Sequence, residues 1–298
     1  NKPQASDDQQ EQSGAFSDAL KASREKADAE EAAAPARTLW SDAWKRLKKN
    51  KLAVIGAVWI VFVVLVALTA DLWAPQLLGS PTDIDTTTVA QSSKLPPSPE
   101  HPFGTDATGR DQLVRVIYGS RVSLTVGVIA TLISTGIGLV MGALAAFYGG
   151  WFDTIIMRLA DMFLAIPYTL FVITMLAVMG QGIQNVFIAI GILGWPSIAR
   201  VFRSAILSVK ENDYVDAARA MGASDLRIVA RHIFPNSVAS IVVYATMNVG
   251  GAILTESALS YLGMGVTPPT PSWGIMIQDG QTFLQTQPWL MIMPGLAI

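Results

Sequence analysis

The chain has 298 residues, 51% of them hydrophobic and 15% charged, and its formal net charge is −2. Soluble domains carry about 25% charged residues, so this composition excludes a soluble enzyme of average design. The charges are also uneven: residues 1–38 hold five basic and eight acidic residues, whereas residues 122–199 hold only Asp153, Arg158 and Asp161. This distribution predicts a polar tail followed by a membrane domain.

Net charge and cysteine content exclude two further classes. A net charge of −2 gives no basic field for nucleic acid, so we expect no nucleic-acid partner. Because the chain has no cysteine, it can have neither a disulfide framework nor a thiolate metal site.

The first 38 residues are rich in Ala, Glu, Asp, Ser, Lys and Gln and contain little to bury. We therefore expect residues 1–38 to be a disordered polar tail, with a transmembrane domain over residues 39–298. The first span is predicted at about 52–74, directly after a stretch with five Lys or Arg between residues 45 and 51.

Further spans are predicted from uncharged runs that end at Gly, Pro or Asn. They lie at about 122–148, 154–179, 183–207 and 236–262, with a partial span at 288–298. The last run would form only about 16 Å of helix against a hydrocarbon core of about 30 Å. We therefore expect six spans, the sixth of which is truncated here.

The Lys and Arg residues predict the orientation of the spans. Segments 37–51 and 200–236 contain six each, whereas segments 75–121 and 263–287 contain four and none. Positive charge accumulates on the cytoplasmic side, so we expect a cytoplasmic N-terminus. Within the second span, small residues recur every four positions, which lets another helix approach closely. These residues are Ser134, Gly138, Gly142 and Ala146.

The loop between the fourth and fifth spans, residues 212–236, is predicted to form two short amphipathic helices. Their apolar stripes are Tyr214, Ala217, Ala218 and Met221, then Leu226, Val229, Ala230 and Ile233. Capping residues are Asn212 or Asp213 for the first helix and Ser224 or Asp225 for the second, with Gly222 between them and Pro235 at the end.

Three interpretations of these two helices remain open on the pattern alone. They could be an ordinary well-packed loop, or one stripe could pack on the bundle while the other receives a partner. A DNA-binding helix-turn-helix has the same periodicity, but this segment is pinned between two spans and has no basic recognition face.

One motif in this loop carries a resemblance to a known family. The order Asp216-Ala217-Ala218, three residues, Gly222 and twelve further residues to Pro235 resembles the EAA loop of permease subunits in ATP-binding-cassette importers. The family pattern has Glu where this chain has Asp216, which keeps the charge on a shorter stem. The resemblance implies that the loop docks on separate ATPase subunits. The residues it implicates are Tyr214, Asp216, Ala217, Ala218, Arg219, Met221, Gly222, Ala223 and Ser224.

Two further segments, 101–124 and 250–274, resemble dipeptide and oligopeptide permeases of the C type, the second permease subunit. With them the resemblance covers residues 40–298. It implies an all-α membrane helix bundle of the type I importer class, in the bacterial cytoplasmic membrane, that moves peptides. Similar permeases import nickel or other small solutes, which is the alternative.

The same resemblance implies partners but no cofactor in this chain. The partners are a second homologous permease in a heterodimer, two ATP-binding subunits that bind ATP and magnesium, an extracytoplasmic solute-binding protein, the peptide and membrane lipid. No Gly is followed by Lys, so the chain has no phosphate-binding loop of its own. We expect a transport subunit and not an enzyme.

Charged and polar residues within the predicted spans are candidate functional residues because they are costly in a membrane. Arg158 and Asp161 are three positions apart and are expected to pair, either to hold two helices in register or to form a gate. Asn248 and Glu256 are candidates for the translocation path, although Glu256 could equally bond to a neighbouring helix or lie near the outer interface.

A polar cluster before the second span contains His101, Asp106, Arg110 and Asp111. Neighbouring glycines favour a turn in which Asp106 bonds local backbone, with a surface pair between Asp111 and Arg115, over a metal site. A self-sufficient ion-coupled transporter is a different class of function, but the ionisable residues in the spans are few for it.

Overall fold

A computed structural model describes residues 47–77, 79–82, 84 and 88–298. The chain divides into two units, residues 1–61 and 62–298. In the first unit, residues 47–49 are helical and helix α3 (Lys51–Leu77) begins, and α3 ends in the second unit. The predicted polar tail, 1–38, lies outside the described residues.

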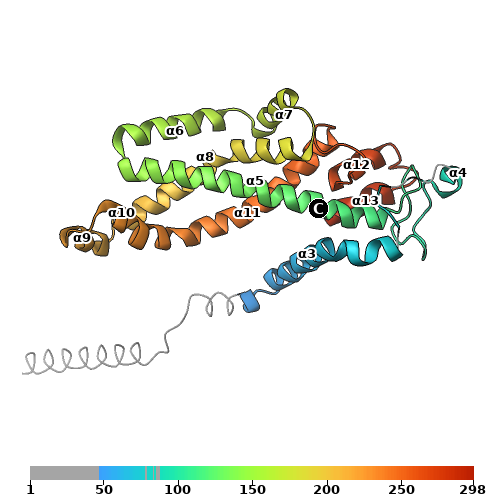
Figure 1. Ribbon diagram of the computed structural model, residues 1–298, viewed down its shortest axis with the longest axis horizontal. Coiled ribbons are helices and arrows are strands. Elements are labelled where there is room, and N and C mark those ends of the chain that lie inside the picture. Colours follow the sequence, from blue (N-terminus) through green and yellow to red (C-terminus); the bar gives the residue numbers. More distant parts are fainter. Residues whose placement is uncertain (1–46, 78, 83, 85–87) are drawn as a thin grey trace, which may run out of the picture. The chain divides into compact units, whose positions relative to one another are not determined.

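The described part of the second unit is helical and has no strand, which confirms the predicted all-α class. Its helices after α3 are α4 (Val89–Ser92), α5 (Gln112–Tyr148), α6 (Gly150–Ala165), α7 (Tyr168–Met179), α8 (Ile183–Lys210), α9 (Asp213–Ala220), α10 (Asp225–Ile228), a π-helix (Val229–Ile233), α11 (Phe234–Tyr261), α12 (Trp273–Gln281) and α13 (Trp289–Ala297). In Figure 1, α9 and α10 lie at one end of α5, α8 and α11, and α12 and α13 lie at the other. We call these the α9 end and the α12 end.

Among the described residues, four helices are long and apolar enough to cross a membrane: α3, α5, α8 and α11. Helices α6 and α7 would make a fifth span, but they are bent by 88° where an uninterrupted span was expected at 154–179. The break follows from Pro167, which cannot donate a backbone hydrogen bond and holds Ile166 in an extended conformation. Helix α13 fills most of 288–298 and has nine residues.

Helix α5 begins at Gln112, ten residues before the start predicted at 122. Its N-cap is Asp111, whose carboxylate accepts from the amide of Val114 at 3.0 Å. The prediction started later because Arg115 and Arg121 interrupt the uncharged run. Both arginines are helical, since each finds a carboxylate partner within the chain.

Helices α5 and α8 form the closest seam of the bundle, along the predicted stripe of small residues (Figure 1). A Cβ on Gly138 would lie 2.7 Å from Cβ of Ile198, and one on Gly142 would lie 2.7 Å from the carbonyl oxygen of Ala199. Only glycine fits at such separations, so the stripe sets the distance between the two backbones.

Candidate functional site: the α9 surface and a central cavity

Helix α9 is anchored to the bundle by one apolar edge. Val215 is fully buried and Ala218 is 4% exposed, in a cluster that includes Phe202 of α8 and Ile233 of the π-helix. Of the predicted stripe, Ala218 is buried as expected, but Tyr214, Ala217 and Met221 are exposed, and Val215 is buried instead. An eight-residue helix has little stability of its own, so this packing holds α9 in place.

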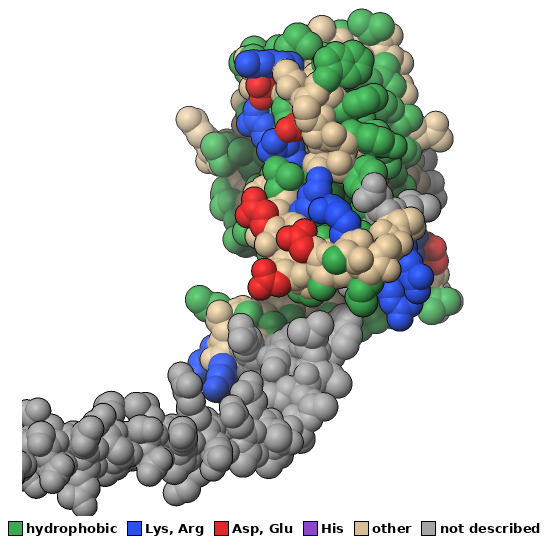
Figure 2. Space-filling view, turned by 90° about the vertical axis from the view of Figure 1, so that its left-hand side faces the viewer, with side chains coloured by type: hydrophobic (Ala, Val, Ile, Leu, Met, Phe, Trp, Pro, Cys, Tyr) green, Lys and Arg blue, Asp and Glu red, His purple; other side chains and the backbone are tan. Residues whose placement is uncertain are grey.

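The opposite side of α9 faces away from the bundle. Tyr214 is 43% exposed and Met221 is 82% exposed. Between them, Asp216 accepts from Arg219 at 3.5 Å, and both side chains of this pair are at least half exposed. Figure 2 views the α9 end directly and shows acidic and basic side chains close together on it. We call Tyr214, Asp216, Ala217, Arg219 and Met221 the α9 surface.

The end of α9 follows the predicted left-handed turn. Gly222 has a φ of 81°. Its amide donates to the carbonyl of Arg219 at 3.0 Å, and the amide of Ala223 donates to that of Ala218 at 3.1 Å. These two bonds form a Schellman motif, which satisfies carbonyls at the helix end. Ser224 follows, and its carbonyl accepts from the amide of Ile228 at 3.0 Å.

Two predicted boundaries of this loop differ in the structure. Asn212 is the N-cap of α9, but its side chain donates to the carbonyls of Ser208 and Val209, so it closes α8 instead. Pro235 does not end the second helix, because α10, the π-helix and α11 follow one another without a turn. Proline is tolerated in the first turn of α11, where no backbone donor is needed.

Ion pairs connect α6 to α8. Arg158 and Asp161 lie 3.7 Å apart, as their spacing predicted, but Asp161 also makes a shorter bond to Arg200 of α8. Asp153 accepts two bonds from Arg203, each at 2.5 Å. The sequence does contain a signal for these pairs. Spans three and four run antiparallel, so the acids near the start of one face the arginines near the end of the other.

A cavity of about 260 Å³ opens between α5, α6, α7, α8 and α11, and sequence reasoning did not find it as a whole. Thirteen residues line it, none of them charged. Seven are apolar or glycine. The other six are Thr131, Ser134, Tyr168, Ser197, Asn248 and Thr255.

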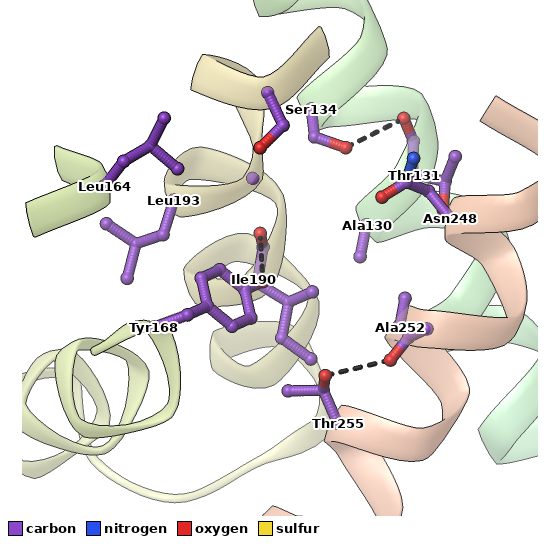
Figure 3. A pocket seen from close by; sticks show the side chains of 13 residues that line it. Ala130, Thr131, Ser134, Leu164, Tyr168, Ile190, Leu193, Asn248, Ala252 and Thr255 are labelled. Atoms are coloured by element: carbon purple, nitrogen blue, oxygen red, sulfur yellow. Dashed lines mark hydrogen bonds between the residues drawn. The ribbon is translucent and has the colours of Figure 1, made fainter. Parts of the chain in front are cut away.

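Four of the six polar side chains, those of Ser134, Tyr168, Asn248 and Thr255, donate hydrogen bonds to backbone carbonyls, and all four are labelled in Figure 3. Tyr168 donates its hydroxyl to the carbonyl of Ile190 at 3.0 Å, which ties the start of α7 to α8. The Nδ2 atom of Asn248 donates to the carbonyl of Tyr244 at 2.8 Å. Figure 3 shows Thr131 and Asn248 on one side of the cavity and Leu164 and Leu193 on the other.

Asn248 and Glu256, the two predicted path residues, are separated by the structure. Asn248 lines the cavity, whereas Glu256 is fully buried elsewhere and does not line it. The carboxylate of Glu256 accepts from Ser123 of α5 at 2.9 Å and from Ser260 at 2.7 Å. Glu256 therefore makes the bond to a neighbouring helix that was one of its predicted arrangements.

The polar cluster of the α12 end is a folded turn. Asp106 accepts from the amides of Thr108 and Arg110 at 2.8 and 3.0 Å, as predicted, and also binds the side chains of Arg110 and Arg115. Burial alone would raise the pKa of Asp106, but the charge of Arg115, the Thr108 bond and Arg110 outweigh it and hold the pKa below 3.8.

The predicted pair between Asp111 and Arg115 is wrong. Asp111 caps α5 and contacts Nδ1 of His101 at 2.8 Å. Arg115 instead forms a salt bridge with Asp106, and its Nη2 atom lies 3.7 Å from a carboxylate oxygen of Asp279 of α12. Within the described residues, no group of three or more His, Asp or Glu could hold a metal ion.

Two family matches cover most of the chain. Residues 137–298 match the binding-protein-dependent transport system inner membrane component. Residues 38–97 match the N-terminal transmembrane domain of oligopeptide transport permease C.

Individual relatives are similar over nearly the whole chain. The dipeptide transport system permease protein of Alkalihalophilus pseudofirmus is 42% identical over 87% of this chain and 83% of the relative. The oligopeptide transport system permease protein of Bacillus subtilis is 40% identical over 90% and 86%. A glutathione transport system permease protein of Escherichia coli is 39% identical over 88% and 84%.

Solved structures show the same fold. An inward-facing form of the MetNI methionine ABC transporter superposes with a TM-score of 0.52 at 18% identity, over 62% of this chain and 88% of that one. This likeness confirms the predicted bundle of the importer permease class.

Proposed function

Because the chain belongs to the family of inner-membrane components of binding-protein-dependent transport systems, we propose that it is the peptide-conducting permease of an ATP-binding-cassette importer. Such a component is a multi-pass inner-membrane protein and a transport subunit, not an enzyme. In the proposed assembly, it pairs with a second homologous permease and receives peptide from an extracytoplasmic solute-binding protein. Its N-terminus and the α9 end face the cytoplasm, in agreement with the basic residues of segments 37–51 and 200–236.

One observation carries the coupling part of the proposal: α9 is held by its buried edge while the α9 surface faces outward. Val215 and Ala218 belong to the same apolar cluster as Phe202 and Ile206 of α8, so a push on α9 is transmitted to a long helix. We propose that two ATPase subunits, which bind ATP and magnesium, dock on the α9 surface.

The proposed substrate is a short peptide. The named relatives transport dipeptides, oligopeptides and glutathione, and glutathione is itself a short peptide. Nickel import lacks support within the described residues, which hold no cluster of metal-binding side chains.

The coupling proposal is tested by Met221→Ala in the complex reconstituted in nanodiscs. Met221 is 82% exposed, so its truncation removes contact area without opening the core. If it is a central contact, the affinity for the ATPase subunits should fall about tenfold, and ATP-driven peptide uptake should fall with it.

Met162→Ala is the matched control, because Met162 is a 60% exposed methionine on α6, away from the α9 surface. This variant should bind the ATPases as the unchanged chain does. Equal affinity in the Met221→Ala and Met162→Ala complexes would rule out docking at this surface.

A further inference from the structure

We infer that the central cavity is a binding site for the backbone amides of the peptide and does not bind its charged groups. This inference rests on the proposed function and adds to it the chemical class of group that the permease recognises. Four observations carry it: the depth of the cavity, its neutral lining, the separate sequestration of the nearest carboxylate and the volume of the cavity.

The cavity lies at mid-depth in the bundle. Ser197 and Asn248 both line it, and each lies at the middle of a 28-residue helix, α8 and α11. Thr131 is similarly placed within α5. The site is therefore far from both membrane surfaces. At this depth a charged ligand loses its hydration, and hydrogen bonds to neutral groups are strongest relative to those in water.

The lining offers hydrogen bonds and no counter-charge. The Nδ2 atom of Asn248 donates to the carbonyl of Tyr244, and its Oδ1 atom is an acceptor for a ligand N–H. Ser197 adds a hydroxyl that can donate or accept. Peptide amides need one acceptor and one donor each, and these neutral groups supply both, whereas an ionised side chain would be buried without a partner.

Glu256 adjoins Thr255 in sequence but is kept out of the cavity. Ser123 and Ser260 hold its carboxylate in the contact between α5 and α11, where it is fully buried. A carboxylate in the cavity would select cationic ligands. Because Glu256 is sequestered, the cavity can recognise the part that all peptides share.

The volume fits a short stretch of backbone. About 260 Å³ exceeds the space that a single bound water needs and is just below a typical ligand pocket of about 300–1,000 Å³. Apolar side chains, Leu164 and Leu193, form the other side and offer no polar contact that would select one peptide side chain over another.

The absence of cysteine in this chain provides a direct test. We would introduce Gly251→Cys, and separately Thr255→Cys, into the complete complex in nanodiscs and follow labelling of this chain by N-ethylmaleimide. Both residues line the cavity, and both variants keep Asn248 and Ser197, the side chains proposed to bind the amides. The added probe is trialanine, without binding protein, so that delivery does not select the ligand. At about ten times its dissociation constant, trialanine should slow labelling about tenfold, because only unoccupied sites react.

Two controls make the test specific. Thr246→Cys lies on α11 two residues from Asn248 but outside the cavity lining, so trialanine should not protect it. Alanyl-lactyl-lactic acid keeps both charged ends of trialanine but has esters in place of its two amides and lacks their N–H donors, so it should protect the Thr255→Cys variant much less than trialanine does.

The outcomes separate this inference from the proposed function. If the unchanged complex imports trialanine but neither cavity variant is protected, the cavity is not a peptide site and the transport function stands. Equal protection by trialanine and alanyl-lactyl-lactic acid overturns amide recognition. Failure of both cavity variants to label without peptide overturns the inference as well, because a site that does not admit a small reagent does not admit a peptide. If the unchanged complex imports no peptide, the proposed function itself fails.

Discussion

The two ends of the bundle differ in how far their paired charged side chains are exposed. At the α12 end, Asp106 and Arg115 are paired inside the fold, with 6% and 3% of their side chains exposed. At the α9 end, the pair between Asp216 and Arg219 has side chains that are 69% and 50% exposed. The α12 end thus satisfies its charges within the chain, whereas the α9 end leaves them available to another protein.

This difference has an energetic consequence. Breaking a buried pair leaves a charge without solvent or partner, which is costly, whereas an exposed pair contributes little to stability. We therefore expect the α12 end to be a fixed structural element and the α9 end to act through its surface. Three predictions test this contrast, from the largest expected effect to the smallest.

The largest effect is expected for Arg115→Met. Its removal leaves buried Asp106 with Arg110 as its remaining cation, which should lower the free energy of unfolding by about 3–5 kcal/mol. Arg219→Met at the α9 end should cost less than about 1 kcal/mol. Thermal unfolding of both variants in detergent measures the difference. Similar losses would show that the two ends are not distinct.

A smaller effect is expected in the seam that joins the two ends. Gly142→Ala forces a Cβ against the carbonyl of Ala199, so we expect a loss of about 1–3 kcal/mol. At Gly136 nothing lies within 4 Å of an added Cβ, so Gly136→Ala should raise stability by up to about 1 kcal/mol. The same unfolding measurement applies. Equal changes would mean that the seam tolerates a wider helix spacing.

The smallest effect appears only in acid. Because the pKa of Asp106 is lower in the folded chain, its stabilisation is complete above the unfolded value of 3.8 and is lost as the pH falls below it. The free energy of unfolding, measured from pH 5 down to pH 3, should fall in the unchanged chain and in the Asp216→Asn variant. The fall should be smaller in the Asp106→Asn variant. If that variant shows the same dependence of the free energy of unfolding on pH, the acid sensitivity belongs to other groups.

Local patterns predicted much of the fold. Runs without charge located the long helices, because a membrane span needs an uninterrupted apolar surface. The small-residue stripe indicated a close contact, and the structure identifies α8 as its partner through Ala199 and Ile198. The start of α5 was missed because a span pattern excludes arginines such as Arg115, even where a carboxylate from another segment compensates them.

The site was predictable only in part. The motif around Gly222 located the α9 region, and the left-handed conformation of that glycine follows from the turn it makes. Which side of α9 packs inward was not predictable, since both Tyr214 and Val215 are apolar enough to be buried. The cavity escaped notice because its lining comes from five helices and consists of common neutral residues.

The sequence by itself determined the class of protein, the approximate spans and the position of the α9 region, because these depend on composition, spacing and motif within short segments. Only the tertiary structure decided that Asn248 lines a cavity while Glu256 is bonded away from it, and that Arg115 pairs with Asp106 rather than Asp111. The reason is physical: a side chain's partner is set by which helix lies opposite, and helix spacing depends on packing between segments distant in sequence.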